Sequence, residues 1–101
     1  MHQRMVPFSS TIKTMRELQR KILEHIFETP MRSDIKWSDI ETLFHGFGAE
    51  ISEGSGSRVR IKLNSVRAVF HRPHPKNITD KGALISVRKF LINAGIHHDE
   101  I

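Results

Sequence analysis

The sequence predicts an α+β fold, with helices on both sides of a short stretch of strands. Between residues 49 and 71, apolar and polar residues alternate, which is the pattern of strands with one buried face. Before and after this stretch, apolar residues recur at helical spacing. The expected order is α-β-β-β-α, preceded by one extra helix at the N-terminus.

Length and composition narrow the class of protein. A chain of 101 residues forms one domain with a modest core. The absence of cysteine excludes disulfides and thiolate sites and fits a cytoplasmic protein. No apolar run approaches the roughly 20 residues that span a bilayer, and the first dozen residues lack the shape of a signal peptide. The net charge of +5 favours an anionic partner, which charge alone does not identify further.

The chain divides into four predicted segments. Residues 1–12 are expected to be a flexible arm, and residues 13–34 a helical extension. Its helix, from about Lys13 to Phe27, ends before Pro30, since a residue preceding proline is disfavoured in helix. Residues 35–96 form the main domain, and residues 97–101 a polar tail.

Sequence signals locate the two helices of the main domain. The first covers residues 37–44, where Ser38 and Glu41 have the spacing of a capping box, although the helix could begin a residue or two earlier. Trp37 lies on its apolar face and is expected to pack in the core, although base stacking is the alternative. The last helix is expected to follow Thr79 as its N-cap and to end at residues 93–95.

Residues 58–63 and 66–71 predict a hairpin around Asn64 and Ser65. A two-residue loop sets Leu63 opposite Val66 and, at the far end, Arg58 opposite His71. The apolar residues then share one face, and the other face carries Arg58, Arg60, Lys62, Arg67 and His71. Directly opposed like charges destabilise a sheet by a few tenths of a kcal/mol, roughly. This unfavourable arrangement, with no carboxylate among these five residues, favours a phosphate-binding surface, and the alternative is an ordinary solvated face.

The segment after the hairpin extends the cationic run. Residues 71–76, HRPHPK, are extended because proline excludes helix, and they add Arg72, His74 and Lys76. His71 and His74 are candidate proton-transfer groups, since histidine titrates near neutral pH. As a metal pair, two histidines without a nearby acidic or thiol ligand make a poor site, so no metal or other cofactor is expected.

Several stretches, in this order, resemble the HicA family, the toxins of bacterial HicA–HicB type II toxin–antitoxin systems. They are residues Trp37–Ile40 with Gly46–Glu53, then GSRVRI, VRAVFHRPHP and TDKGALISVRKFLINAGI. The resemblance covers about residues 35–96. It implies a double-stranded-RNA-binding-like fold with a three-stranded antiparallel sheet backed by two helices. It also implies an mRNA interferase, a metal-independent endoribonuclease that inhibits translation and is neutralised by a HicB-like antitoxin.

The chain departs from the family at one position. HicA toxins typically carry a key histidine after a Gly-Ser pair at the start of the second strand, where this chain has Arg58 after Gly56 and Ser57. The predicted register sets His71 opposite Arg58, so His71, and after it His74, are the predicted catalytic residues. The predicted RNA-binding residues are Arg58, Arg60, Lys62, Arg67, Arg72 and Lys76. Two alternatives are an RNA-binding domain without catalysis and a module whose basic face binds an acidic protein.

Overall fold

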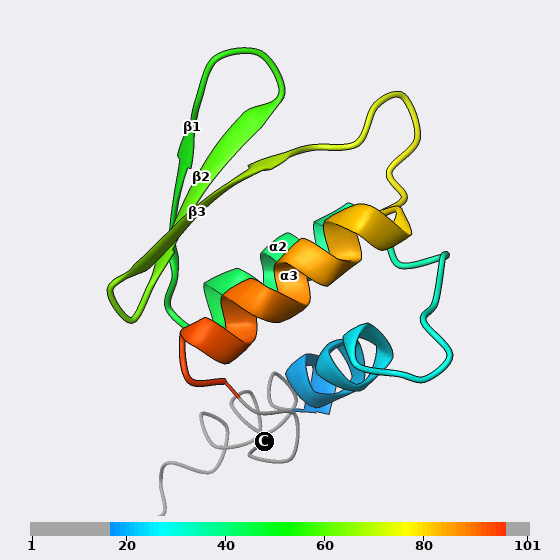
Figure 1. The fold of residues 1–101 in the computed structure, drawn as a ribbon. Helices are drawn as coiled ribbons and strands as arrows, with labels where there is room; N and C mark the ends of the chain where they lie inside the picture. Colours follow the sequence, from blue (N-terminus) through cyan, green and yellow to red (C-terminus); the bar gives the residue numbers. More distant parts are fainter. Residues whose placement is uncertain (1–16, 97–101) are drawn as a thin grey trace, which may run out of the picture.

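The computed structural model describes residues 17–96 (Figure 1). The predicted arm, the predicted tail and the start of the first helix lie outside these residues. Within the described part, the chain forms a helix over residues 17–26, a second helix α2 and a third helix α3, with three strands between α2 and α3. Their bounds are α2 Trp37–Gly46, β1 Glu50–Glu53, β2 Arg58–Leu63, β3 Val66–His71 and α3 Lys81–Asn93. The predicted α+β fold is confirmed.

The three strands form an open antiparallel sheet in the order β1-β2-β3. Helices α2 and α3 lie side by side along one face of this sheet, and the helix over residues 17–26 packs beside them (Figure 1). Because both helices cover the same face, no helix among residues 17–96 covers the other face, which we call the open face. The fold therefore has one sheet layer and one helical layer, as in double-stranded-RNA-binding-like domains.

All helices and strands except β1 contribute buried side chains to one core. From residues 17–26 these include Leu23 and Ile26, each 0% exposed. The centre of the core is aromatic. The ring of Phe90 packs edge to face against Phe44 and Phe70, at centroid distances of 5.4 and 5.7 Å. Such pairs add about 0.5–1.5 kcal/mol each to the effect of burial. Trp37 belongs to this cluster and is 3% exposed, so its indole packs in the core as predicted.

The predicted hairpin register is confirmed along its whole length, from Leu63 opposite Val66 to Arg58 opposite His71. Both loop residues have positive φ, 51° at Asn64 and 71° at Ser65, as a two-residue mirror-image turn requires. The Asn64 side-chain amide donates to the Ala94 carbonyl at 2.8 Å. This bond fixes the hairpin tip to the end of α3.

One arginine joins the first helix to α3. The Arg88 guanidinium donates to the carbonyls of Ile26 and Glu28 at 2.7 and 2.8 Å, and it lies 5.7 Å from the ring centroid of Phe27. Carbonyls at the C-terminal end of a helix have no partner within the helix and carry its negative dipole end. Arg88 therefore caps the helix over residues 17–26 from another element.

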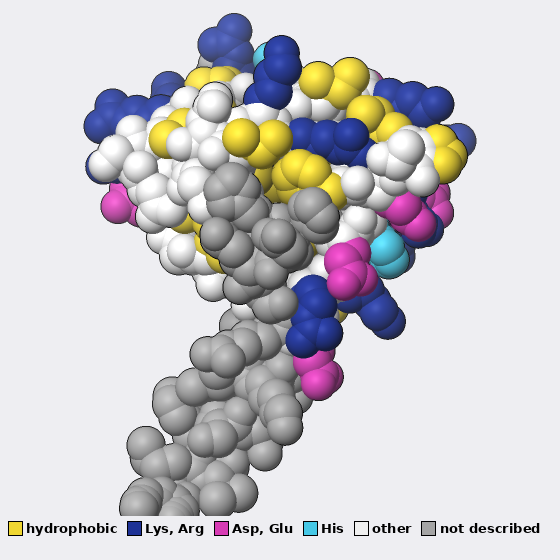
Figure 2. All heavy atoms as spheres, turned by 60° about the horizontal axis from the view of Figure 1, so that its bottom comes forward, with side chains coloured by type: hydrophobic (Ala, Val, Ile, Leu, Met, Phe, Trp, Pro, Cys, Tyr) yellow, Lys and Arg dark blue, Asp and Glu magenta, His cyan; other side chains and the backbone are white. Residues whose placement is uncertain are grey.

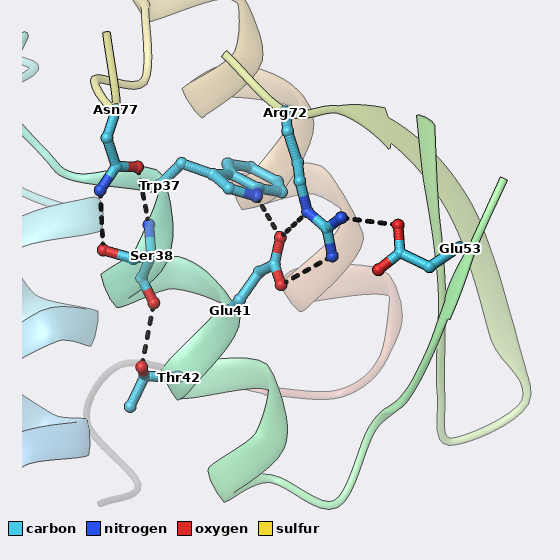
Figure 3. A network of polar contacts seen from close by, with 7 residues as sticks. All are labelled: Trp37, Ser38, Glu41, Thr42, Glu53, Arg72 and Asn77. Carbon is cyan, nitrogen blue, oxygen red and sulfur yellow. Dashed lines mark hydrogen bonds and ion pairs between the residues drawn. The ribbon is translucent and has the colours of Figure 1, made fainter. Parts of the chain in front are cut away.

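The predicted capping box at the start of α2 is wrong. The N-cap residue is Lys36, and no side chain of its own segment caps the helix. Asn77 performs this role from the loop before α3, because its Oδ1 accepts from the Ser38 N–H at 3.1 Å and its Nδ2 donates to Ser38 Oγ at 2.9 Å (Figure 3). Glu41 faces a different partner, described below.

The predicted start of α3 is one residue early. Asp80 is the N-cap, and its carboxylate accepts from the Ala83 N–H at 2.8 Å. Thr79 is instead buried, and its N–H donates to the Ile35 carbonyl at 2.8 Å. The segment before α2 and the loop before α3 thus run side by side, and Thr79 belongs to this pairing while Asp80 caps the helix.

Positive charge is spread widely over the molecule. Seen from the lower side of Figure 1, Lys and Arg side chains stand around the edge of the surface, with hydrophobic side chains between them (Figure 2). The net positive charge therefore does not locate a binding face by itself. A binding face is located better by asking which Lys and Arg side chains form ion pairs within the protein and which do not.

Candidate nucleic-acid interface

The open face of the sheet presents its side chains in three rows across the strands. Residues directly opposite each other in an antiparallel pair point to the same side. The first row is Glu50, Lys62 and Arg67; the second is Ser52, Arg60 and Val69; the third is Arg58 and His71. Successive rows are two residues apart along a strand, or about 7 Å.

Arg58 and His71 form a close pair in the third row. The next pair outward is hydrogen-bonded, since the Arg72 N–H donates to the Ser57 carbonyl at 2.9 Å. Hydrogen-bonded and non-hydrogen-bonded pairs alternate, so Arg58 and His71 occupy a non-hydrogen-bonded pair, with Cα atoms about 4.5 Å apart and side chains close together. Both side chains are exposed. His71 and Arg58 therefore occupy directly opposite positions on the open face, at the end of the sheet.

The cations of the open face form no ion pair among residues 17–96, although Glu50 lies directly opposite Lys62 on β1. The ion pairs found in that part of the chain involve none of Arg58, Arg60, Lys62 and Arg67. Arg60 donates to a backbone oxygen, the carbonyl of Glu53, at 3.1 Å. Lys62 and Arg67 stand directly opposite each other, which is unfavourable without an anion between them.

Strand β1 adds polar groups that the hairpin pattern alone does not reveal. Glu50 stands in the row of Lys62 and Arg67, so the open face as a whole carries a carboxylate. Ser52 stands beside Arg60 in the next row. The alternation in residues 49–53 separates Glu50 and Ser52 from Ile51, but assigning them to this face requires knowing that β1 pairs with β2.

A hollow of about 570 Å³ lies over the first two rows. Its lining consists of Glu50, Ser52, Arg60, Ile61, Lys62, Arg67, Ala68 and Val69. Val69 is 55% exposed, a large fraction for a hydrophobic side chain among the described residues. The hollow therefore combines cations with an apolar contact.

Arg72 has a different environment from the other predicted RNA-binding residues. Its Nε donates to Glu41 Oε2 at 2.7 Å, its Nη2 to Glu41 Oε1 at 3.2 Å and its Nη1 to Glu53 Oε1 at 2.7 Å (Figure 3). The Trp37 indole N–H also donates to Glu41. The guanidinium thus joins the segment after β3 to α2 and β1, with a two-pronged contact to one carboxylate.

The electrostatics of this network agree with its geometry. Partial burial alone would raise the pKa of Glu41, but the hydrogen bonds from Arg72 and Trp37 outweigh it, and the pKa lies below its ordinary value. Hydrogen bonds to Glu41 and Glu53 raise the pKa of the Arg72 guanidinium above its ordinary value. Both groups are therefore held in their charged forms.

His74 and Lys76 lie beyond the sheet. Both are exposed in the loop between β3 and α3, which leads away from the strands towards the start of α3 (Figure 1). The structure therefore brings together Arg58, Arg60, Lys62, Arg67 and His71. It places His74 and Lys76 in the adjoining loop and turns Arg72 towards two carboxylates.

These features define a small basic α+β domain with an exposed histidine among cations. The family described as "HicA toxin of bacterial toxin-antitoxin" matches residues 37–96, which is more than half of the chain. The chain belongs to this family, and a toxin of a toxin–antitoxin system has a cognate antitoxin as its partner. No curated protein and no solved structure matches the chain.

The matched range contains α2, the whole sheet and α3, and it begins after the helix over residues 17–26. The open face and the Arg72 network both lie within it. Within residues 17–96, no helix is long and apolar enough to cross a membrane.

Proposed function

We propose that this toxin is a metal-independent endoribonuclease that cleaves mRNA in the cytoplasm, inhibits translation and is neutralised by a HicB-like antitoxin. The observation that carries the proposal is the close pair of His71 and Arg58 in the third row of the open face. Family membership supports the toxin role. The further cations on the same face support an RNA substrate.

The chemistry needs few protein groups because RNA carries its own nucleophile. The 2′-oxygen attacks the adjacent phosphorus, a bond forms between them, and the bond from phosphorus to the 5′-oxygen breaks. His71 serves as the base that takes the 2′-proton or as the acid that protonates the 5′-oxygen. Arg58 stabilises the charge on the non-bridging phosphate oxygens. His74 is the second candidate for either proton transfer. The products are a 2′,3′-cyclic phosphate and a 5′-hydroxyl.

A second candidate function is RNA binding without cleavage. It is favoured by Arg58 at the position where HicA toxins typically carry a histidine. Among residues 17–96, moreover, no side-chain hydrogen bond orients the ring of His71. A catalytic imidazole usually has such a bond, since it fixes which nitrogen carries the proton.

The test is cleavage of a long single-stranded RNA by the purified full chain in EDTA. We expect wild type to cut, and His71→Ala to cut about 10²- to 10⁴-fold more slowly, which is the range for loss of a general acid or base. His45→Ala is the matched control, because His45 is exposed at the end of α2 and outside the open face. We expect it to cut like wild type.

Each other outcome points to a different function. Wild type that binds RNA but leaves it intact supports the binding domain and overturns the nuclease. Equal cutting by wild type and His71→Ala overturns the assignment of His71 and makes His74→Ala the next variant. No RNA affinity at low salt indicates that the basic face binds an acidic protein, for which the antitoxin is the first candidate.

A further inference from the structure

The three rows of the open face give it a direction. Strand β2 carries a cation in every row, with Arg58 at its first residue, Arg60 in the middle and Lys62 near its end. These positions are about 7 Å apart. That step suits one nucleotide of an extended single strand, whose backbone carries one negative charge per nucleotide. The column of cations therefore resembles the backbone-tracking grooves of proteins that bind single-stranded nucleic acid.

The histidine stands at one end of this column. His71 is the last residue of β3 and pairs with Arg58, whereas β1 reaches only as far as the partner of Val59. The two rows with further cations thus lie on the same side of His71. An RNA strand whose scissile phosphate lies at His71 therefore meets the further cations of the sheet in one direction only, while Lys76 lies in the loop that leads away from the strands.

The first row is the strongest second site for a phosphate. Lys62 and Arg67 are directly opposed, form no ion pair among residues 17–96, and occupy a non-hydrogen-bonded pair like that of Arg58 and His71. A phosphate between them turns repulsion into two attractions. Glu50 on the β1 side repels the same phosphate, so the RNA passes over β2 and β3 rather than over β1.

The middle row provides an apolar contact. Val69, 55% exposed, lies opposite Arg60 in the hollow. Exposed apolar surface beside a cation suits the face of an unstacked base with its phosphate on the arginine. A fully base-paired strand does not offer that face. The row therefore favours single-stranded over duplex RNA.

We propose that the open face is a one-sided track for single-stranded RNA. The scissile phosphate lies at Arg58 and His71, and Lys62 with Arg67 hold a phosphate about two nucleotides away on one side of the cut. Efficient cleavage therefore requires the strand to extend about two nucleotides on that side and little on the other. The inference rests on the proposed nuclease function for its cleavage readout, while its binding readout stands alone.

The first experiment varies substrate length on each side separately. The substrates are deoxyribonucleotide strands with one ribonucleotide, which is the one cleavable position, and with randomised neighbours. They are lengthened on the 5′ side or on the 3′ side by one to four nucleotides. We expect kcat/KM to rise roughly tenfold by the second added nucleotide on one side and then to level off, in line with charge-assisted phosphate contacts. Equal gains on both sides, or no gain on either, overturn the track.

The second experiment removes the distant site. In Lys62→Ala and in Arg67→Ala, we expect the ratio of kcat/KM for the long strand to that for the short strand to fall towards one. Lys89→Ala is the control, since Lys89 is exposed on α3. We expect it to keep the wild-type ratio. A ratio kept in the two open-face variants overturns the assignment of their row.

Failure of the proposed function is distinguishable from failure of the track. If no strand is cut, the nuclease proposal fails, and the track is judged by the affinity of all-deoxy strands of the same lengths. We expect affinity to increase with length in wild type, and Lys62→Ala to lose most of that increase. An affinity that is independent of length, or an unchanged increase in the variant, overturns the track.

Discussion

The open face and the Arg72 network both take their cations from residues 54–79, a stretch without Asp or Glu, but these cations have different environments. Arg72 is held by two carboxylates, Glu41 and Glu53. Arg58 and Arg67 lie within 14 residues of it along the chain and have no acidic partner in the described part of the molecule. A basic stretch of sequence therefore does not show which of its cations are available to a ligand. Contacts with distant segments decide that.

The largest expected difference is in activity. Replacing Arg58 with alanine removes the charge beside His71, so we expect the cleavage rate to fall by about 10²- to 10³-fold. The melting temperature should change little, because this side chain is exposed and bonded to no acidic group within residues 17–96. Single-turnover cleavage and a thermal melt measure the two effects. A rate equal to that of Arg20→Ala, an exposed arginine on the helix over residues 17–26, contradicts the role of Arg58.

The next effect is in stability and concerns Arg72. Arg72→Ala leaves the Glu41 carboxylate, with 18% of its side chain exposed, without its guanidinium partner. We expect a loss of about 1–3 kcal/mol in the free energy of unfolding, seen by urea titration. Arg72→Lys should recover part of this loss, since the lysine ammonium keeps the charge but cannot make the two-pronged contact of a guanidinium. Stability equal to wild type in Arg72→Ala means that the network contributes nothing.

A smaller effect appears in the pH dependence of stability. The folded-state pKa of Glu41 is lowered, so its contribution to stability is present above the ordinary pKa of about 4.5 and is lost as pH falls through the folded-state value. Urea titrations from pH 6 to about pH 3 should therefore show a shallower decline for Glu41→Gln than for wild type. The hydrogen bond from Arg32 also lowers the pKa of Asp34, so this group too loses its contribution to stability as pH falls. This pair is exposed, and its effect is expected to be small. Parallel pH curves contradict the assignment.

The smallest effect concerns the opposed cations. Arg67→Ala relieves the repulsion of Lys62, so we expect unfolding to become less favourable by a few tenths of a kcal/mol, roughly. The same variant should bind RNA more weakly, with a slope of log affinity against log salt that is smaller by about one. Arg72→Ala should keep the wild-type slope. Equal slopes in Arg67→Ala and wild type place Arg67 outside the RNA contact.

Local pattern was sufficient to predict the sheet and much of the core. The hairpin register follows from a two-residue loop and the period-2 alternation, because a slip by one residue would turn the apolar side chains to solvent. The pairing of Arg58 with His71 follows from the same register. The assignment of His71 and His74 to catalysis remains a prediction.

What could not be predicted depends on contacts between distant segments. Asn77 caps a helix that begins 40 residues earlier in the chain. Arg72 forms its ion pair with Glu41, which lies 31 residues earlier. Nothing in either local sequence distinguishes these side chains from solvent-exposed ones. Glu50 was missed on the open face for a similar reason, since its position depends on which strand β1 pairs with.

The contact of Arg88 with the first helix has a consequence for how this protein can vary. The family match begins at residue 37, and Arg88 holds the preceding helix through backbone carbonyls rather than through particular side chains. Carbonyls are present whatever the sequence of the helix, so substitution at its exposed positions preserves these two hydrogen bonds, whereas the buried Leu23 and Ile26 remain constrained by the core. Since α3 lies behind the sheet, such change leaves the open face intact. The exposed surface of the extension can thus change in sequence while the toxin domain keeps its open face.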